Sequence, residues 1–237
     1  MRDRILMIGA AAAIVVAAAC GDSNGPGGAS SVALLVNPNF VSYDTADYGS
    51  EGSEMEHTLR SFGVDVHPIT AYDSVTIDSI LSLSQAFVLP ELNNAFQDSL
   101  TPATRALLRH WVDSSGGLLI FVSTNEALAL LDSLWGHAIT SGNSHNTYPL
   151  VGAAASGTAF AGGPSLVWDN DGTYLMDGAT LPAGSHAVYA AGTDVAVSVT
   201  PQGRGAFVLI AWDWYNAAPH GSQDGGWIEV LKRALRS

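Results

Sequence analysis

The sequence predicts an α/β fold: a doubly wound, mainly parallel sheet with a β-rich insertion in its second half. In the first half of the chain, short apolar runs alternate with segments of helical periodicity. These runs are apolar enough to be strands covered on both faces, as in parallel sheets. From about residue 140 to about residue 200 the composition changes to Gly, Ala, Ser and Asn with short β-like runs. A final strand and a closing helix then complete the domain.

The expected strands are apolar runs that end at turn-forming residues. The first, SVALLV, ends at Asn37-Pro38, and the third, AFVL, ends at Pro90-Glu91. The fourth, LLIFV, follows Gly116-Gly117. It is the clearest candidate in the chain for a central strand of the sheet. We expect strands at residues 31–36, 64–67, 86–89, 118–122, 186–190, 195–199 and 206–212.

The expected helices are bounded by residues that favour helix ends. Ser53 and Glu56 have the spacing of a capping box, and Gly63 stands where a left-handed C-cap is favoured. Thr101 and Pro102 supply an N-cap followed by proline at the first helical position. We expect helices at residues 53–62, 75–83, 102–115, 125–135 and 227–235.

The first twenty residues are typical of an export signal. Arg2 and Arg4 precede an uncharged stretch, residues 5–19, which is shorter than the roughly 20 residues that span a bilayer. The end of that stretch, AAAC, resembles the lipobox of bacterial lipoproteins, although Ala17 stands where leucine is usual. The resemblance implies cleavage before Cys20 and lipidation of that residue, which would anchor the protein to the membrane. The alternative is a simple signal peptide with an incidental cysteine.

This interpretation divides the chain into three parts. Residues 1–19 form the signal peptide, residues 20–30 the lipidated Cys20 and a flexible tether, and residues 31–237 the folded domain. Cys20 is the only cysteine, so no disulfide can form within the chain. We expect an extracytoplasmic protein of the bacterial envelope. Because Gly21 gives no aspartate retention signal, the outer membrane or the cell surface is favoured.

The charge of the chain argues against nucleic acid as a partner. The net charge is −13 and the sequence pI is about 4.6. A surface with this charge repels phosphate backbones. The expected partners are therefore the membrane, through Cys20, and a sugar, a glycan or another envelope protein.

Polar and aromatic residues follow several of the expected strands. In an open parallel sheet, ligands bind beyond the carboxyl ends of the strands. Polar groups beside aromatic rings suit a small polar ligand such as a sugar. The alternative is that these loops are polar because they are wet, with aromatics that pack and carboxylates that cap helices. The candidate ligand-binding residues are Tyr43, Asp44, Glu91, Asn125, Asp213 and Tyr215.

Several segments together resemble the class I glutamine-amidotransferase-like superfamily. They are residues 37–52 (NPNFVSYDTADYGSEG), 87–92 (FVLPEL), 157–164 (GTAFAGGP) and 203–227, which include AWDWYNAAP. The similarity is to the noncatalytic, extracellular branch that neighbours the ThuA-like proteins. It implies a flavodoxin-like fold and says little about activity, because one fold hosts many functions.

The sequence departs from that superfamily at its nucleophile. The family uses a cysteine on a strand-to-helix turn, whereas residues 122–126 read VSTNE here, without G-x-C-x-G or G-x-S-x-G spacing. Cys20 lies upstream of the fold and cannot substitute. Ser123 as a nucleophile would need a base, and no histidine stands where the family pattern marks one. We therefore exclude cysteine-dependent glutamine hydrolysis and predict no catalytic residue and no cofactor.

Metal-ligand motifs are also missing from the sequence. The seven histidines are scattered and show neither H-x-H nor H-E-x-x-H spacing. Glu54, Glu91 and Asp213 could gather around a divalent ion at the sheet edge. The segment 169–172 (DNDG) resembles part of a calcium loop but is better explained as a turn. We predict no metal.

Three functions remain open at this point. The preferred one is an envelope-anchored lipoprotein whose domain binds a small polar ligand, a glycan or a partner protein without cysteine chemistry. The second is a ThuA-like enzyme that acts on a sugar or glycan through Glu91 and Asp213. The third is a structural or interaction module of the envelope. Trp214 and Tyr215 bear on this choice, because they could either close the core or form a stacking surface beside Asp213.

Overall fold

The structure is a computed structural model that describes residues 28–47, 49–170 and 172–237. The expected signal peptide, Cys20 and most of the expected tether lie outside the described residues. No helix within the described ranges is long and apolar enough to cross a bilayer.

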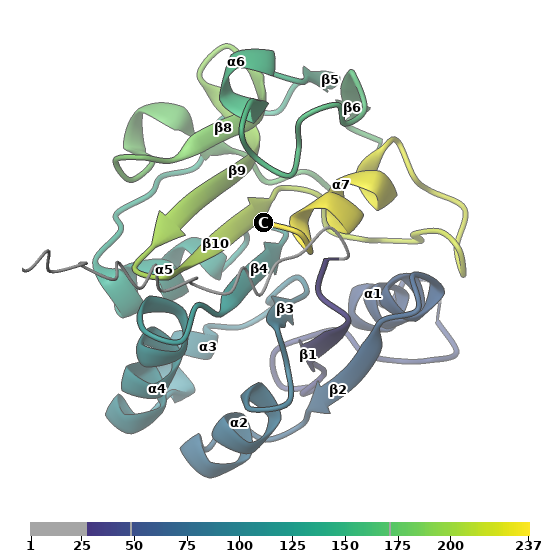
Figure 1. The fold of residues 1–237 in the computed structure, drawn as a ribbon. Coiled ribbons are helices and arrows are strands. Elements are labelled where there is room, and N and C mark those ends of the chain that lie inside the picture. The colour runs from purple at the N-terminus through teal and green to yellow at the C-terminus, as the bar shows by residue number, and fades with distance from the viewer. Residues whose placement is uncertain (1–27, 48, 171) are drawn as a thin grey trace, which may run out of the picture.

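One mixed sheet organises the fold (Figure 1). Its strand order is β2-β1-β3-β4-β10-β9-β7, and β8 also pairs with β9. The five neighbouring strands β2, β1, β3, β4 and β10 are parallel to one another. Strand β9 pairs antiparallel with β10, and β8 and β7 each pair antiparallel with β9. The predicted fold class, a mainly parallel α/β sheet with additional β structure from the second half, is confirmed. The strands are β1 (Ser31–Leu35), β2 (Asp65–Ile69), β3 (Ala86–Leu89), β4 (Leu118–Val122), β7 (Met176–Asp177), β8 (His186–Ala191), β9 (Asp194–Gln202) and β10 (Gly205–Ile210).

Helices cover both faces of this sheet. Alternate residues of β1 point to opposite faces, so Val32 and Leu34 join one core while Ala33 and Leu35 join the other. The first core contains residues of α1 (Glu51–Ser61) and α7 (Trp227–Ala234). The second contains residues of α2 (Ser74–Leu81), α3 (Phe96–Ser99), α4 (Pro102–Asp113) and α5 (Ala127–Trp135).

The segment between α5 and β9 builds a smaller layer on the first core. It contains a hairpin-like pair, β5 (Thr147–Pro149) with β6 (Leu166–Trp168), the short helix α6 (Gly152–Ala155) and the 3₁₀ helix η1 (Gly178–Thr180). The buried Tyr148, Phe160 and Val167 attach this layer to the core. The segment ends with β8, which pairs with β9. Because β9 pairs in turn with β10, both strands extend the main sheet.

One helix boundary differs from the sequence prediction. Helix α1 begins at Glu51, with Ser50 as N-cap, and not after Ser53. The Ser53 hydroxyl donates to the carbonyls of Asp44 and Ser50 instead of accepting from the helix. The predicted capping box is therefore wrong, because Ser53 is already inside the first turn and its hydroxyl fastens the preceding loop.

Candidate functional site

The carboxyl ends of the five neighbouring parallel strands lie at one edge of the sheet. The register aligns the ends of β3, β4 and β10, with Leu89 beside Phe121 and Val122 beside Ile210. The strand order reverses between β1 and β3, since β2 lies on one side of β1 and β3 on the other. This is the topological position at which open α/β sheets bind ligands.

Glu91 lies just beyond the end of β3. The residue is only 7% exposed, and its Oε1 accepts a hydrogen bond of 3.2 Å from Asn125 Nδ2. Burial raises the pKa of Glu91 from 4.5 to about 7; the hydrogen bond from Asn125 opposes this shift, and the negative charges of Asp213 and Glu51 add to it. Glu91 therefore titrates near neutral pH.

Asp213 follows β10, which is separated from β3 by β4, and its negative charge acts on Glu91. It is 9% exposed, and its Oδ1 accepts the backbone N–H of Tyr215 at 3.0 Å. Gly172, with φ at +36°, leaves room for this carboxylate, because a Cβ there would lie 1.7 Å from Asp213 Oδ2. The loop before β7 thus helps to hold Asp213 in place.

Glu51 is a third carboxylate of this site, and the sequence analysis did not select it. It stands at the first position of α1. Burial raises its pKa, and its charge bears on both Glu91 and Tyr174. We call Glu51, Glu91, Asn125 and Asp213 the carboxyl-edge site.

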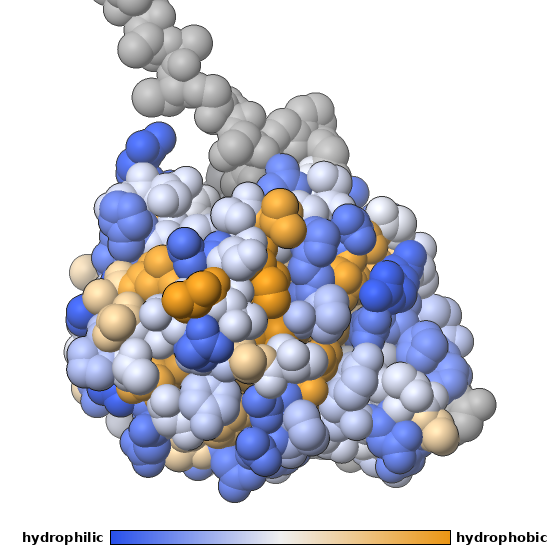
Figure 2. All heavy atoms as spheres, turned by 90° about the horizontal axis from the view of Figure 1, so that it is seen from below, coloured by the Kyte–Doolittle hydropathy of each residue, from blue (hydrophilic) through white to orange (hydrophobic). Residues whose placement is uncertain are grey.

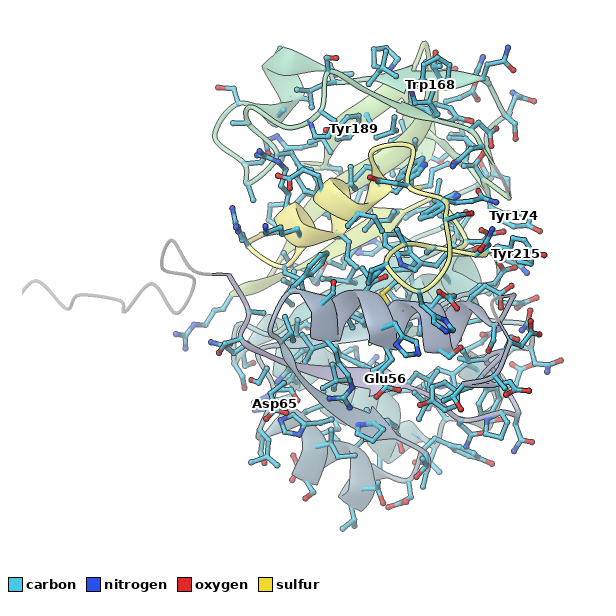
Figure 3. All side chains as sticks on the ribbon, turned by 90° about the vertical axis from the view of Figure 1, so that its right-hand side faces the viewer. Glu56, Asp65, Trp168, Tyr174, Tyr189 and Tyr215 are labelled. Atoms are coloured by element: carbon cyan, nitrogen blue, oxygen red, sulfur yellow. The ribbon has the colours of Figure 1, made fainter. Side chains whose placement is uncertain are left out.

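Two exposed tyrosines interact with residues of this site: the backbone N–H of Tyr215 donates to Asp213, and the charge of Glu91 acts on Tyr174. Both tyrosines are labelled in Figure 3. Tyr174 is 46% exposed and Tyr215 43% exposed. The charge of Glu91 is the main reason that the pKa of Tyr174 is raised, followed by burial and the charge of Asp213. A cavity of about 230 Å³ adjoins Tyr174 and is also lined by Thr124 and Asn125. The site therefore combines buried acids, an amide and open aromatic faces.

Tyr43 and Asp44 have other contacts. The Tyr43 hydroxyl donates to Glu56 on α1, and burial raises its pKa to about 12. The exposed Asp44 accepts from Ala46 N–H at 2.9 Å and so shapes its own turn. No described interaction joins either residue to Glu91 or Asp213. Of the six predicted residues, the structure brings together Glu91, Asn125, Asp213 and Tyr215.

The predicted grouping of Glu54 with Glu91 and Asp213 does not form. Glu54 is fully buried and accepts from His220 Nδ1 at 2.6 Å and from Gly221 N–H at 3.1 Å. It therefore fastens the loop after β10 onto α1. Among the described residues, no group of three or more His, Cys, Asp or Glu side chains is placed to hold a metal ion.

Ser123 lies in the turn between β4 and α5, directly after the last residue of β4. Its φ of +65° is in the left-handed region, and it is fully buried. Its Oγ accepts the backbone N–H of Asn125 at 3.3 Å. The hydroxyl thus supports the turn that presents Asn125 to Glu91.

The two aromatic residues after Asp213 have separate roles. Trp214 is fully buried, packs on Trp212 with ring centroids 4.7 Å apart, and donates to Thr58 Oγ1 at 3.1 Å. Tyr215 stays open, and its ring lies against Gly49. The expectation from the sequence that one of Trp212 and Trp214 serves the core and the other the loop is wrong, because both are fully buried; Tyr215 is the aromatic residue of this segment that stays at the surface.

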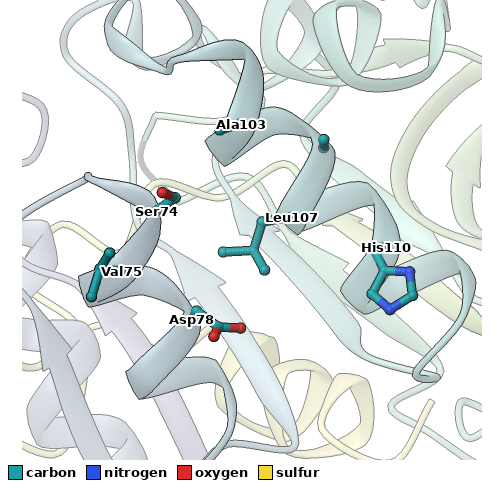
Figure 4. A pocket seen from close by; sticks show the side chains of 7 residues that line it. Ser74, Val75, Asp78, Ala103, Leu107 and His110 are labelled. Carbon is teal, nitrogen blue, oxygen red and sulfur yellow. The ribbon is translucent and has the colours of Figure 1, made fainter.

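A second hollow lies away from the carboxyl-edge site. It is a groove of about 480 Å³ between α2 and α4, lined by residues that include Val75, Asp78, Leu107 and His110 (Figure 4). These helices lie at the bottom of Figure 1, and the face seen from below carries apolar patches bordered by hydrophilic side chains (Figure 2). The groove contains none of the predicted site residues.

Comparisons with known proteins support the fold. Neither the protein-family models nor the curated proteins gave a match. Among solved structures, Cytoplasmic Protein STM3548 from Salmonella typhimurium matches with a TM-score of 0.55 at 12% identity, over 87% of this chain and 98% of that one. A ThuA-like protein from Bacteroides uniformis matches with a TM-score of 0.54 at 8% identity, over 86% and 89% of the two chains.

The fold resembles that of a ThuA-like protein. A glutamine amidotransferase from Thermotoga maritima also aligns, over 86% of this chain and 95% of that one, with a TM-score of 0.48 at 14% identity. At these identities the matches describe the fold and not the activity. The comparisons thus support a mainly parallel α/β fold similar to that of the ThuA-like protein.

Proposed function

We propose that this domain binds a small, hydroxyl-rich ligand such as a sugar at the carboxyl-edge site. We further propose that lipid on Cys20 holds the domain at the bacterial envelope, with the outer membrane or cell surface favoured. The observation that carries the binding proposal is that Glu91, Asn125 and Asp213 act on one another at the edge of the sheet, where the exposed Tyr174 and Tyr215 also interact with them. Directed hydrogen-bonding groups beside aromatic surface are what small polar ligands require.

The test is a ligand screen of the purified protein. Thermal shift followed by isothermal titration against neutral mono- and disaccharides is expected to find a ligand whose affinity falls at least tenfold in Tyr174→Ala or Tyr215→Ala. Both tyrosines are exposed, so these variants retain the core. Val75→Ala in the α2–α4 groove is the matched control, and its affinity should equal that of the wild type. Binding that Val75→Ala abolishes and the tyrosine variants leave intact would contradict the proposal.

A carboxylate-dependent enzyme is the second candidate. It is favoured by the pKa of Glu91, about 7, beside the acidic Asp213. A carboxyl group with a pKa near 7 can serve as a general acid or a general base at neutral pH. Hydrolysis of a chromogenic glycoside that is lost in both Glu91→Gln and Asp213→Asn would support the enzyme. Binding of the same sugar without turnover would leave a binding domain.

A further inference from the structure

The exposed basic side chains of the domain gather at one end of the sheet. Helices that connect parallel strands run back from the carboxyl ends of the strands to their amino ends. The second halves of α1 and α4, the turn before β10, and the end of α7 with the residues after it therefore lie at the amino ends. Among the residues that the structure describes, the exposed lysine and arginine side chains all lie in these segments. We call them the basic end: Arg60, Arg109, Arg204, Lys232 and Arg236.

The described chain begins at this basic end. The backbone N–H of Ala29 donates to the carbonyl of Leu235, just after α7, at 2.7 Å. Gly28 lies against Arg236, because a Cβ on Gly28 would be 2.8 Å from Arg236 Cγ. The segment that leads back to Cys20 therefore leaves the domain directly beside one of the exposed cations.

Other cations lie close to that exit. Lys232 Nζ is 6.0 Å from the centre of the ring of Phe62, the C-cap residue of the helix that carries Arg60. Arg204 directly precedes β10, and its side chain donates to the carbonyl of Ser114 at 3.2 Å. Strand β10 is the third strand from β1 in the order of the sheet, a separation of roughly 15 Å at about 4.8 Å per strand.

The acidic side chains at the same end are partly neutralised. Glu56 pairs with Arg60 at 2.6 Å, and the half-buried Asp113 accepts hydrogen bonds from two side-chain N–H groups. Asp65, at the start of β2, and Asp132, in the last turn of α5, are exposed. The exposed cations therefore outnumber the exposed acids here, although the net charge of the whole chain is −13.

The acidic carboxyl-edge site lies at the opposite end of the strands. The six residues of β10 span roughly 20 Å at about 3.3 Å per residue. This length is more than twice the Debye length of about 8 Å at physiological salt. In Figure 3, Tyr174 and Tyr215 lie at the right edge, whereas the purple start of the described chain lies at the left. A charged surface that meets the basic end is therefore largely screened from Glu91 and Asp213.

An exposed apolar side chain also lies at the basic end. Leu83 is 61% exposed in the turn between α2 and β3. Two residues later, Gln85 Oε1 accepts the backbone N–H of Ser30 at 2.7 Å, so Leu83 lies near the point where the chain leaves the domain. An apolar side chain among cations suits the interface of a bilayer, where it can enter the headgroup region while the cations meet lipid phosphates.

The distance from Cys20 to the domain is limited by the chain. Eight residue steps separate Cys20 from Gly28. Even a fully extended chain of this length reaches only roughly 28 Å. A lipid on Cys20 would therefore keep the basic end, and not the carboxyl-edge site, close to the membrane.

We infer that the basic end is a docking surface for anionic lipid headgroups, which holds the anchored domain with its carboxyl-edge site facing away from the membrane. Cations beside a lipid anchor are attracted to anionic lipid over about a Debye length. The inference rests on the proposed anchor at Cys20 and adds the orientation of the domain, in which the ligand site stays open to solutes.

Lys232 provides the measurement, because it is the only lysine in the chain. The full-length protein is coupled through Cys20, its only thiol, to maleimide lipids in vesicles, and acetylation of Lys232 is followed by peptide mass spectrometry. The rate is expected to be at least threefold lower on vesicles that contain phosphatidylglycerol than on pure phosphatidylcholine vesicles. The difference should vanish near 1 M salt, where the Debye length is about 3 Å.

Two comparisons locate the contact. Ala46→Lys introduces an amine in the exposed loop after β1, at the opposite end of the strands, and this amine should react equally fast on both kinds of vesicle. Arg204→Gln combined with Arg236→Gln should remove the difference at Lys232. Val75→Glu combined with Ala103→Glu changes the net charge by the same amount at the exposed starts of α2 and α4, and should preserve the difference.

Equal rates at Lys232 on the two kinds of vesicle would overturn the inference. So would a difference that survives high salt or the paired arginine substitutions, or one that affects the Ala46→Lys amine as strongly as Lys232. Coupling through Cys20 supplies the anchor, so these outcomes do not depend on lipidation in the cell. Failure of the proposed anchor would appear instead as a Cys20→Ser protein that fractionates in bacteria as the wild type does.

Discussion

At the scale of single residues, the burial of Glu91 lowers the free energy of unfolding by an amount that depends on pH. Its pKa is 4.5 in an unstructured chain and about 7 in the fold. Between these values the unfolded chain releases a proton that the folded chain retains, so the free energy of unfolding falls as pH rises. Below pH 4.5 this loss of stability is absent, and above pH 7 it is fully present.

Glu91→Gln removes this dependence. We expect the variant to be more stable than the wild type at pH 8 by on the order of 1–3 kcal/mol, and nearly equal to it at pH 4.5. Urea denaturation at the two pH values measures the difference. Asp44→Asn, which changes an exposed carboxylate, is the control and should show no such dependence. A stability difference for Glu91→Gln that is the same at both pH values would contradict the burial described for Glu91.

The residues of the site were only partly predictable. Glu91, Asn125 and Asp213 follow strands, and the parallel register brings the ends of those strands together. Glu51 could have been selected, because α1 is the helix that follows β1. Its first turn therefore lies near the carboxyl ends of the strands. Tyr174 gave no signal, because backbone hydrogen bonds to Ala211 and Thr124, which no local pattern predicts, hold it at the site.

At the scale of elements, the site depends on the contact between α1 and the loop after β10. Thr58 on α1 accepts from Trp214 Nε1 and donates to the carbonyls of Glu54 and Ala218. Trp214 lies between Asp213 and Tyr215 in the chain. The contact of Trp214 with Thr58 therefore also restricts the positions of its chain neighbours, Asp213 and Tyr215.

Thr58→Val tests this contact. The substitution preserves the shape of the side chain and leaves the buried indole N–H without an acceptor, at an expected cost of about 1–3 kcal/mol in the free energy of unfolding. Chemical denaturation followed by tryptophan fluorescence measures it. Thr58→Ser retains the hydroxyl and should lose less. Equal losses in the two variants would show that packing of the methyl group, and not the hydrogen bond, holds the loop.

The elements themselves followed from periodicity and apolar runs. β3 and β4 were predicted at 86–89 and 118–122 and are found there. Errors arose where tertiary contacts decide: Ser53 fits a capping box in isolation, but its hydroxyl is taken by the loop that contains Asp44. β9 runs from Asp194 to Gln202, longer than the predicted 195–199, because it pairs with β10 on one side and β8 on the other.

At the scale of the whole molecule, the order of elements determined the fold class before any contact was known. Alternating strands and helices with runs covered on both faces permit few topologies other than a doubly wound sheet. The way in which the second half joins this sheet was not predictable. Its small residues and short runs have weak periodicity, so pairing with β10 and packing of Tyr148 and Tyr189 decide their arrangement.

The proposed anchor also belongs to this scale. Cys20→Ser removes the sulfur that would carry lipid, so we expect the protein to move from the membrane fraction to the soluble fraction of a bacterial host. Fractionation and immunoblotting measure this shift. A Ser23→Ala variant is the control and should stay with the membranes. Retention of Cys20→Ser in the membrane fraction would contradict lipid anchoring at this residue.

The most direct test of the central claim is a crystal structure of the protein soaked with the sugar that the ligand screen identifies. The account predicts ordered sugar beyond the carboxyl ends of β3, β4 and β10, with a hydroxyl within hydrogen-bond distance of Glu91 or Asn125 and its ring against Tyr174. Sugar bound only in the α2–α4 groove, or Glu91 covered by protein in the presence of saturating sugar, would contradict it.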